Sequence, residues 1–122
     1  MMKANYEEKV NEMKTIIGQG NIDNNYIAGC ENNQYIKKGN IVTYKFTMQV
    51  KTNFESTTSF VTGLPKPLLN TRFTGVLANA TNQGQALRFE LRTDGSIRNA
   101  YSPTNPQKDN HIEGYICYIS ED

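Results

Sequence analysis

The clearest pattern in the chain is a regular alternation of apolar and polar residues over Ile41–Val50. Every second residue from Val42 to Val50 is apolar, and Thr, Lys, Thr and Gln occupy the positions between them. Successive side chains of a strand point to opposite faces, so a period of two indicates a strand with one buried face and one solvated face. We therefore predict a long strand over Ile41–Val50, within an antiparallel sheet.

A second alternation precedes a turn signal. Leu87, Phe89 and Leu91 alternate with charged residues, and the dipeptide Asp94–Gly95 follows. This dipeptide is typical of two-residue type I′ hairpin turns, which need a positive φ at both central residues. We expect residues 96–101 to return antiparallel to residues 86–93.

Shorter runs of the same kind occur between turn residues along the rest of the chain. The further strand candidates are Tyr26–Cys30, Gln34–Lys38, Thr57–Thr62, Thr71–Ala78 and His111–Ser120. About eight short strands, with a turn signal roughly every ten residues, are typical of sandwiches and jelly rolls. The predicted fold is therefore all-β: an antiparallel, jelly-roll-like β-sandwich over residues 21–122.

The apolar faces of these strands define a predicted core. Its members are Val42, Tyr44, Phe46, Met48, Phe60, Leu64, Phe73, Leu77, Leu87, Phe89, Leu91, Ile97, Ile116 and Tyr118. Pro65 and Pro67 end the strand that starts near Thr57, because proline has no amide hydrogen for a strand ladder. We expect a rigid corner there, where the chain crosses from one sheet to the other.

One segment follows a helical period instead. Between Asn5 and Ile17, apolar residues recur at spacings of four, three and four, at Tyr6, Val10, Met13 and Ile17. Asn5 can cap the first turn, and two glycines after Ile17 would end the helix. Residues 1–20 are predicted as a helical unit, either docked on the chain's own sheet or self-associated as a short parallel bundle and trimeric stalk.

Composition limits the possible functions. The chain has 122 residues and a net charge of +1, which favours a single domain and gives no electrostatic reason to expect a nucleic-acid or membrane partner. The sequence shows no apolar run of membrane-spanning length and no signal peptide, so we expect a soluble protein. Cys30 and Cys117 suggest neither a disulfide framework nor a metal site, and we expect Cys117 to be buried.

Catalytic motifs are weak. His111 lies near Asp109 and Glu113 in sequence and could be imagined as a general base, but a solvated loop entering a strand explains the same residues. The sequence contains no nucleophile elbow and no phosphate-binding glycine loop. We therefore predict a protein that is not an enzyme and needs no cofactor or metal.

Three long polar loops remain, and they could either bind a ligand or be solvated turns. Amides and hydroxyls beside an aromatic ring would suit a sugar, which offers hydroxyls and an apolar ring face. The candidate ligand-binding residues are Asn79, Asn82, Gln85, Tyr101, Asn105, Asp109 and His111.

Four segments together carry a resemblance to a known class of domain. In chain order they read KKGNIVTYKFTMQV, FVTGLPKPL, LRTDGSIRN and EGYICYIS. Over Tyr26–Ser120 the chain resembles the C-terminal domains of phage tail, baseplate and tail-fibre proteins from phages or prophages of hosts with Gram-positive cell walls. Those domains have a longer gap between the two corner prolines than the Pro-Lys-Pro of this chain.

The resemblance implies a β-sandwich that assembles as a homotrimer beneath a helical stalk. It also implies a place in the virion, assembled in the host cytoplasm, with other virion proteins and a host cell-wall saccharide as partners. The alternative is a carbohydrate-binding module of a secreted or cell-associated bacterial protein, which would be a monomer with an aromatic groove.

Overall fold

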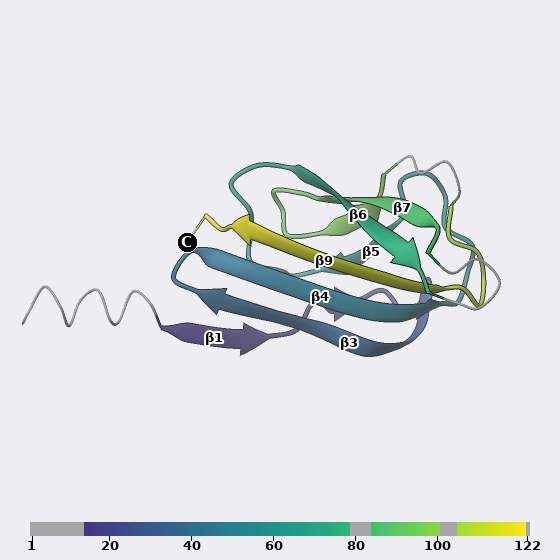
Figure 1. The fold of residues 1–122 in the computed structure, drawn as a ribbon, viewed down its shortest axis with the longest axis horizontal. Helices are drawn as coiled ribbons and strands as arrows, with labels where there is room; N and C mark the ends of the chain where they lie inside the picture. Colours follow the sequence, from purple (N-terminus) through teal and green to yellow (C-terminus); the bar gives the residue numbers. More distant parts are fainter. Residues whose placement is uncertain (1–13, 79–83, 101–104, 122) are drawn as a thin grey trace, which may run out of the picture.

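The computed structural model describes residues 14–78, 84–100 and 105–121, which form one antiparallel sheet (Figure 1). Its strands are β1 (Thr15–Gly18), β2 (Asn21–Ile22), β3 (Ile27–Lys38), β4 (Ile41–Val50), β5 (Ser59–Thr62), β6 (Thr71–Leu77), β7 (Ala86–Leu91), β8 (Ile97–Asn99) and β9 (His111–Ile119). The prediction of an all-β antiparallel fold is confirmed.

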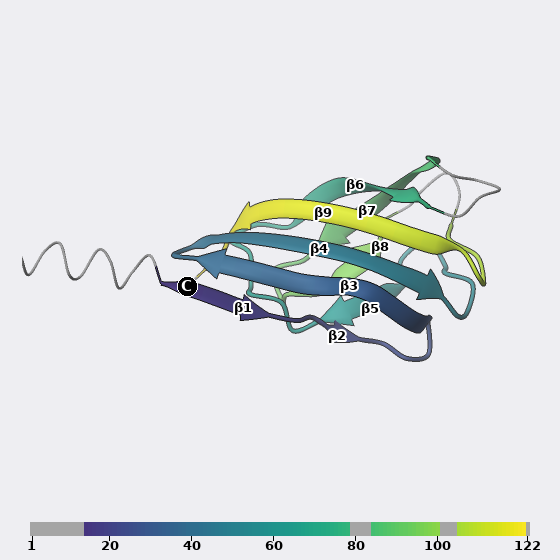
Figure 2. The ribbon, with the colours of Figure 1, turned by 60° about the horizontal axis from the view of Figure 1, so that its bottom comes forward.

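The sheet is continuous and curled, rather than divided into two separate layers. Its strand order is β1-β3-β4-β9-β6-β7-β8-β5-β2. Figures 1 and 2 show the sheet bending so that β5 lies across from β4. The ring centroids of Phe46 on β4 and Phe60 on β5 are 5.6 Å apart across the enclosed space. The described residues therefore form a half-barrel, and the finer prediction of a clear sandwich is not met.

The strand predictions were accurate for the long alternating segments. The strand β4 has the predicted bounds, and it pairs with β3 on one side and β9 on the other. The two strands predicted over Tyr26–Cys30 and Gln34–Lys38 form the single strand β3, because the polar run between them continues to pair with β4 through a register shift between Cys30 and Asn32. Such bulges absorb an extra residue without ending a strand.

The hairpin between β7 and β8 has a different turn from the one predicted. Gly95 N donates to Arg92 O at 2.9 Å, and Arg92 N donates to Ser96 O at 2.8 Å. Gly95 has a φ of 84°, whereas Asp94 has no positive φ, so the type I′ prediction is wrong. The loop is a type I turn followed by a glycine bulge. A Cβ on Gly95 would lie 2.3 Å from Leu64 O, so the backbone of the proline corner also requires glycine here.

The proline corner connects β5 to β6 and supports the end of β9. Tyr118 donates its hydroxyl to Pro65 O at 2.7 Å, and Leu68 N donates to Ile119 O at 3.2 Å. Since β5 and β6 belong to the same curled sheet, the corner crosses over the end of the half-barrel rather than between two sheets.

The predicted helix is wrong where it can be checked. Thr15–Gly18 is the strand β1, and Ile17 pairs with Ile36 of β3 instead of completing a helical stripe. Two β-branched isoleucines favour a strand, and the edge of β3 supplies backbone partners that a short helix lacks. Tyr6, Val10 and Met13 lie outside the described residues.

The core prediction is confirmed except at one position. Of the predicted residues only Phe73 is partly exposed, and its ring packs on Phe89 with centroids 5.6 Å apart. The structure adds six buried residues that the core prediction did not include: Ile27, Val50, Phe54, Val61, Ala100 and Ile112.

A buried polar cluster joins the two ends of the sheet. Residues 18–20 run from β1, at one end of the strand order, to β2 at the other end. Gly20 N donates to Asn33 Oδ1 at 3.1 Å, and Asn33 Nδ2 donates back to Gly20 O at 2.8 Å. The Tyr44 hydroxyl donates to the same Asn33 oxygen, and burial raises the pKa of Tyr44 far above its usual value. These bonds satisfy the buried Asn33 amide and hold the curled sheet at its opening.

Candidate functional site

The outward face of β3, β4 and β9 carries polar and aromatic side chains in two neighbouring rows. The strand registers place Gln34, Lys45 and Tyr115 in one row. Asn32, Thr47 and Glu113 form the next row. The backbone of Tyr115 pairs with Lys45 in the sheet, and the residue is 59% exposed.

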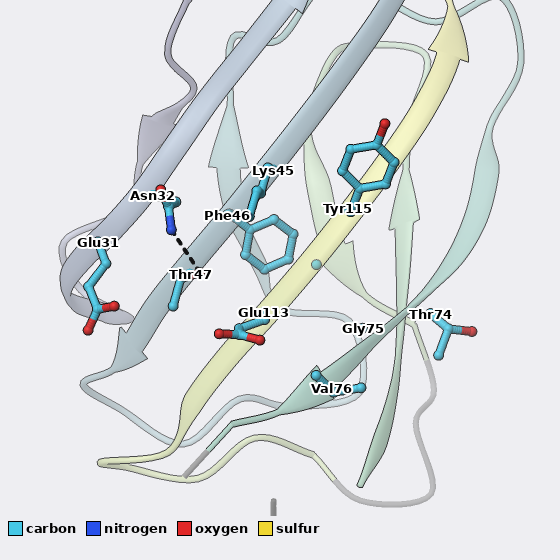
Figure 3. A pocket seen from close by; sticks show the side chains of 11 residues that line it. Glu31, Asn32, Lys45, Phe46, Thr47, Thr74, Gly75, Val76, Glu113 and Tyr115 are labelled. Carbon is cyan, nitrogen blue, oxygen red and sulfur yellow. Dashed lines mark hydrogen bonds between the residues drawn. The ribbon is translucent and has the colours of Figure 1, made fainter. Parts of the chain in front are cut away.

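These rows border a groove of about 350 Å³ (Figure 3). Figure 3 shows Tyr115 and Lys45 at one end of the groove and Glu31, Thr47 and Glu113 at the other. A second hollow, lined by Gln34, Ile36 and Thr43, shares Lys45 and Tyr115 with the first. The polar groups therefore follow a continuous depression on the sheet's outer face.

Two glycines shape the floor of the groove. Gly75 of β6 pairs with Gly114 of β9, and both line the groove. A Cβ on Gly114 would lie 2.5 Å from the Phe46 ring, and a Cβ on Gly75 would lie 2.4 Å from Glu113 O. The aromatic core therefore reaches directly beneath the backbone at this point, and any larger residue would displace it.

A bulge in β3 supplies one wall. The register passes from Cys30 paired with Met48 to Asn32 paired with Thr47, so Glu31 is the extra residue. Bulges re-aim side chains, and here the Glu31 carboxylate lines the groove. Asn32 Nδ2 donates to Thr47 Oγ1 at 3.3 Å, which orients the amide beside it (Figure 3).

The arrangement suits reversible binding of a polyhydroxylated ligand. The exposed Tyr115 ring offers an apolar face, with Lys45 at the same end of the groove, and Asn32 and Thr47 offer further hydrogen-bonding groups along it. A sugar ring combines an apolar face with hydroxyls, which is the complement of such a surface. Within the described ranges, no group of three or more His, Cys, Asp or Glu side chains is placed to hold a metal ion.

The structure separates the loop residues that the sequence suggested as a site. Asn79, Asn82 and Tyr101 lie outside the described residues. Asn105 Oδ1 accepts a bond from the buried Asn99 amide at 2.7 Å, so this side chain helps to fix its loop. Gln85 also has a structural bond, because its carbonyl accepts Leu77 N at 2.9 Å.

The two remaining loop candidates lie at the start of β9. Asp109 has a φ of 72° in a turn that Asn110 N closes by donating to Gln107 O at 3.0 Å, and its own N–H donates to Val50 O at 2.8 Å. His111 lies on the outward face opposite Gln49 and lines a small hollow that continues from the groove past Thr47. Of the predicted residues, His111 alone is thus seen next to the groove among those the structure describes.

Sequence reasoning missed Tyr115, the central aromatic residue of the groove. The signal was present, because Tyr115 alternates with the predicted core residues Ile116 and Tyr118 and so had to point outward. The same alternation shows that the expected burial of Cys117 is wrong, since this thiol is exposed. Cys30 is also exposed, and both cysteines are free.

The comparisons with known proteins leave the chain without an assigned family. No protein-family model matches it, and no curated protein shows significant similarity to it. Across residues 14–78, 84–100 and 105–121, no helix has the length and apolar character needed to cross a bilayer.

Proposed function

We propose that this protein is a non-enzymatic structural module of a phage virion, from a tail fibre or baseplate, and that it contacts a saccharide of the host surface. The virion context rests on the sequence resemblance over Tyr26–Ser120 and is compatible with the all-β fold. The observation that carries the binding role is the outward groove around Tyr115. The alternative, a carbohydrate-binding module of a secreted or cell-associated bacterial protein, would use the same groove.

In this proposal the sugar stacks on Tyr115, while Lys45 and Asn32 bind its hydroxyls. The groove is shallow and most of a bound sugar would stay in contact with water, so each copy would bind weakly. Linked copies would raise the apparent affinity by 10²–10⁴-fold, about the usual range for multivalent binding. A virion that displays many copies fits such weak individual contacts.

A titration with neutral cell-wall oligosaccharides, followed by NMR, tests this proposal. We expect shifts at residues lining the groove and loss of binding in Tyr115→Ala, because the stacking surface is removed. Leu69→Ala is the matched control, since Leu69 is 73% exposed and lies away from the groove. Saturable binding that is unchanged in Tyr115→Ala, or the absence of binding to any wall fragment, would contradict the proposal.

Self-association as a homotrimer is the second part of the proposal. Four exposed isoleucines, here called the apolar band, lie one each on the outer face of β1, β3, β4 and β9: Ile17, Ile36, Ile41 and Ile119. Ile16 and Ile17 are 46% and 62% exposed on opposite faces of β1. Within the described part of the chain, β1 has one sheet neighbour, so its other edge is open to pairing. A second copy would cover both the edge and the band.

Light scattering of the intact chain measures this assembly. We expect Ile17→Asp to shift the equilibrium toward monomer, because a carboxylate would be buried in the contact, whereas Thr62→Asp on β5 should not. Val10→Asp tests the preceding segment separately. A chain that is monomeric at tens of micromolar would contradict self-association and favour the alternative function.

A further inference from the structure

All four arginines of the chain lie together on one surface, although its nine lysines are spread along the sequence. Arg72 of β6 is paired with Glu90 of β7, which is paired with Arg98 of β8. Arg88 lies two residues before Glu90, and Arg92 lies two residues after it. Alternation places all of them on the outward face, since Leu87, Phe89 and Leu91 are buried. We call Arg72, Arg88, Arg92 and Arg98 the arginine surface.

A single carboxylate organises three of these guanidinium groups. Glu90 Oε1 lies 2.9 Å from both Arg92 Nη1 and Arg98 Nη2, and Glu90 Oε2 lies 3.5 Å from Arg72 Nε. The Glu90 side chain is only 10% exposed, whereas that of Arg72 is 62% exposed. The carboxylate is therefore enclosed, and Arg72 is the most exposed of its three arginine partners.

Glu90 alone cannot accept hydrogen bonds from all the guanidinium N–H groups around it. Three guanidiniums carry about fifteen N–H donors, whereas one carboxylate accepts about four hydrogen bonds. Burial acts to raise the pKa of Glu90, but the charges and hydrogen bonds of Arg98 and Arg92 outweigh it and lower the pKa, so Glu90 is ionised. Among the described residues Asp94 is a second carboxylate, which interacts with the charge of Arg92 and accepts hydrogen bonds from Ser96 at one oxygen. The surface thus has an excess of positive charge that the chain's net charge of +1 conceals.

We propose that the arginine surface binds the phosphate groups of an anionic polymer. Guanidinium groups match phosphate oxygens with two parallel hydrogen bonds, which a lysine ammonium does not. Glu90 orients the guanidinium groups of its three arginine partners, so these side chains lose little conformational freedom when a ligand binds. β7 separates the strands of Arg72 and Arg98, so their backbones are about 10 Å apart, while both guanidinium groups converge on Glu90. Several guanidinium groups contributed by three strands suit a ligand with several phosphate groups more than a single phosphate ion.

The surface favours a phosphate-bearing polymer other than nucleic acid. Proteins that bind single-stranded nucleic acid combine positive charge with aromatic rings on which bases stack. Among the described residues of β6, β7 and β8, the aromatic residues are Phe73 and Phe89, and their rings pack on each other instead. The proposal does not depend on the saccharide groove, because the two surfaces use different residues.

Calorimetric titration of the intact chain with sodium tripolyphosphate provides the first test. We expect saturable binding that weakens as salt increases, and about a tenfold loss in Arg72→Gln, the size expected for one charged hydrogen-bonded contact. Lys66→Gln removes the same charge from an exposed site elsewhere and should bind normally. The affinity of Arg72→Lys should fall between those of the two glutamine variants, because lysine keeps the positive charge but cannot form two parallel hydrogen bonds. Equal losses in Arg72→Gln and Lys66→Gln, or no binding at all, would overturn the proposal.

Polymers of different chemistry provide the second test. Linear polyphosphate should bind more tightly than polyglutamate of equal charge, since phosphate recognition is proposed rather than charge attraction alone. Oligothymidylate that binds as tightly as polyphosphate would overturn the choice of a polymer other than nucleic acid. Tyr115→Ala should leave polyphosphate binding unchanged. Loss of that binding in Tyr115→Ala would overturn the assignment to the arginine surface while leaving the groove in place.

Discussion

The two halves of the sheet differ on their outer faces and agree on their inner ones. The long strands β3, β4 and β9 present isoleucines, hydroxyls, amides and Tyr115 to solvent. The shorter strands β6, β7 and β8 present arginines around one carboxylate. Figure 2 shows both halves as parts of one curled sheet.

The inner faces of both halves meet in a single aromatic cluster. Phe46 from the long half packs on Phe89 from the short half at 5.5 Å, and Phe60 contacts both rings. Packing therefore requires large apolar residues on the inner face of both halves, whereas the outer faces are free to carry different kinds of side chain.

The largest expected effect tests whether the two halves share one core. Phe46→Ala and Phe89→Ala should each lower the free energy of unfolding by about 3–5 kcal/mol, because each leaves a cavity beside the other ring. Urea denaturation measures both, and the double variant should lose less than the sum because the rings are in contact. A loss below about 1 kcal/mol at either site would show that its half does not depend on this cluster.

A smaller effect is expected at the boundary between the halves. Gly114→Ala places a Cβ 2.5 Å from the Phe46 ring and should cost about 1–3 kcal/mol through overpacking. Gly29→Ala is the matched control on the same sheet, because nothing lies within 4 Å of its added Cβ. Thermal unfolding of the two variants compares them directly. Similar melting temperatures would mean that the groove floor is not closely packed.

The smallest effect concerns the short half alone. Glu90→Gln should lower stability by about 1 kcal/mol at neutral pH, because the arginines lose their carboxylate. The folded-state pKa of Glu90 lies below its unfolded value, so this contribution is complete above the ordinary glutamate pKa of about 4.3. It is lost as the pH falls through the folded-state value.

Denaturation of both proteins from pH 7 to pH 3 checks this dependence. The difference between wild type and Glu90→Gln should shrink at the acidic end. A difference that stays constant with pH would show that the glutamine amide, and not the lost charge, accounts for the change.

Most of the fold followed from the period of the sequence. The strand β4 was predicted to the residue, and the core of β7 was predicted on the correct face, because alternation by two allows one assignment of inside and outside. Turn type was harder, since Asp94–Gly95 fits both a type I′ turn and a type I turn with a glycine bulge. The contact with Leu64 O adds a constraint that local sequence does not contain.

The candidate sites were less predictable for a physical reason. The groove around Tyr115 and the arginine surface are each built from strands that are distant in sequence, and only the strand order brings Arg72, Glu90 and Arg98 into one row. The same limit explains why Ile17 was predicted in a helix but lies in a strand. Its strand partner Ile36 is nineteen residues away, so the local sequence does not reveal the pairing.

The two residues between β1 and β2, Gln19 and Gly20, affect how the domain unfolds. Because they link the first and last strands of the order, neither edge can peel away without pulling on the other. The bonds between Gly20 and Asn33 hold this link against β3, and Asn21 and Ile22 hold it against β5. In hydrogen exchange, the amides at both edges should therefore open together as one cooperative unit, rather than fraying independently.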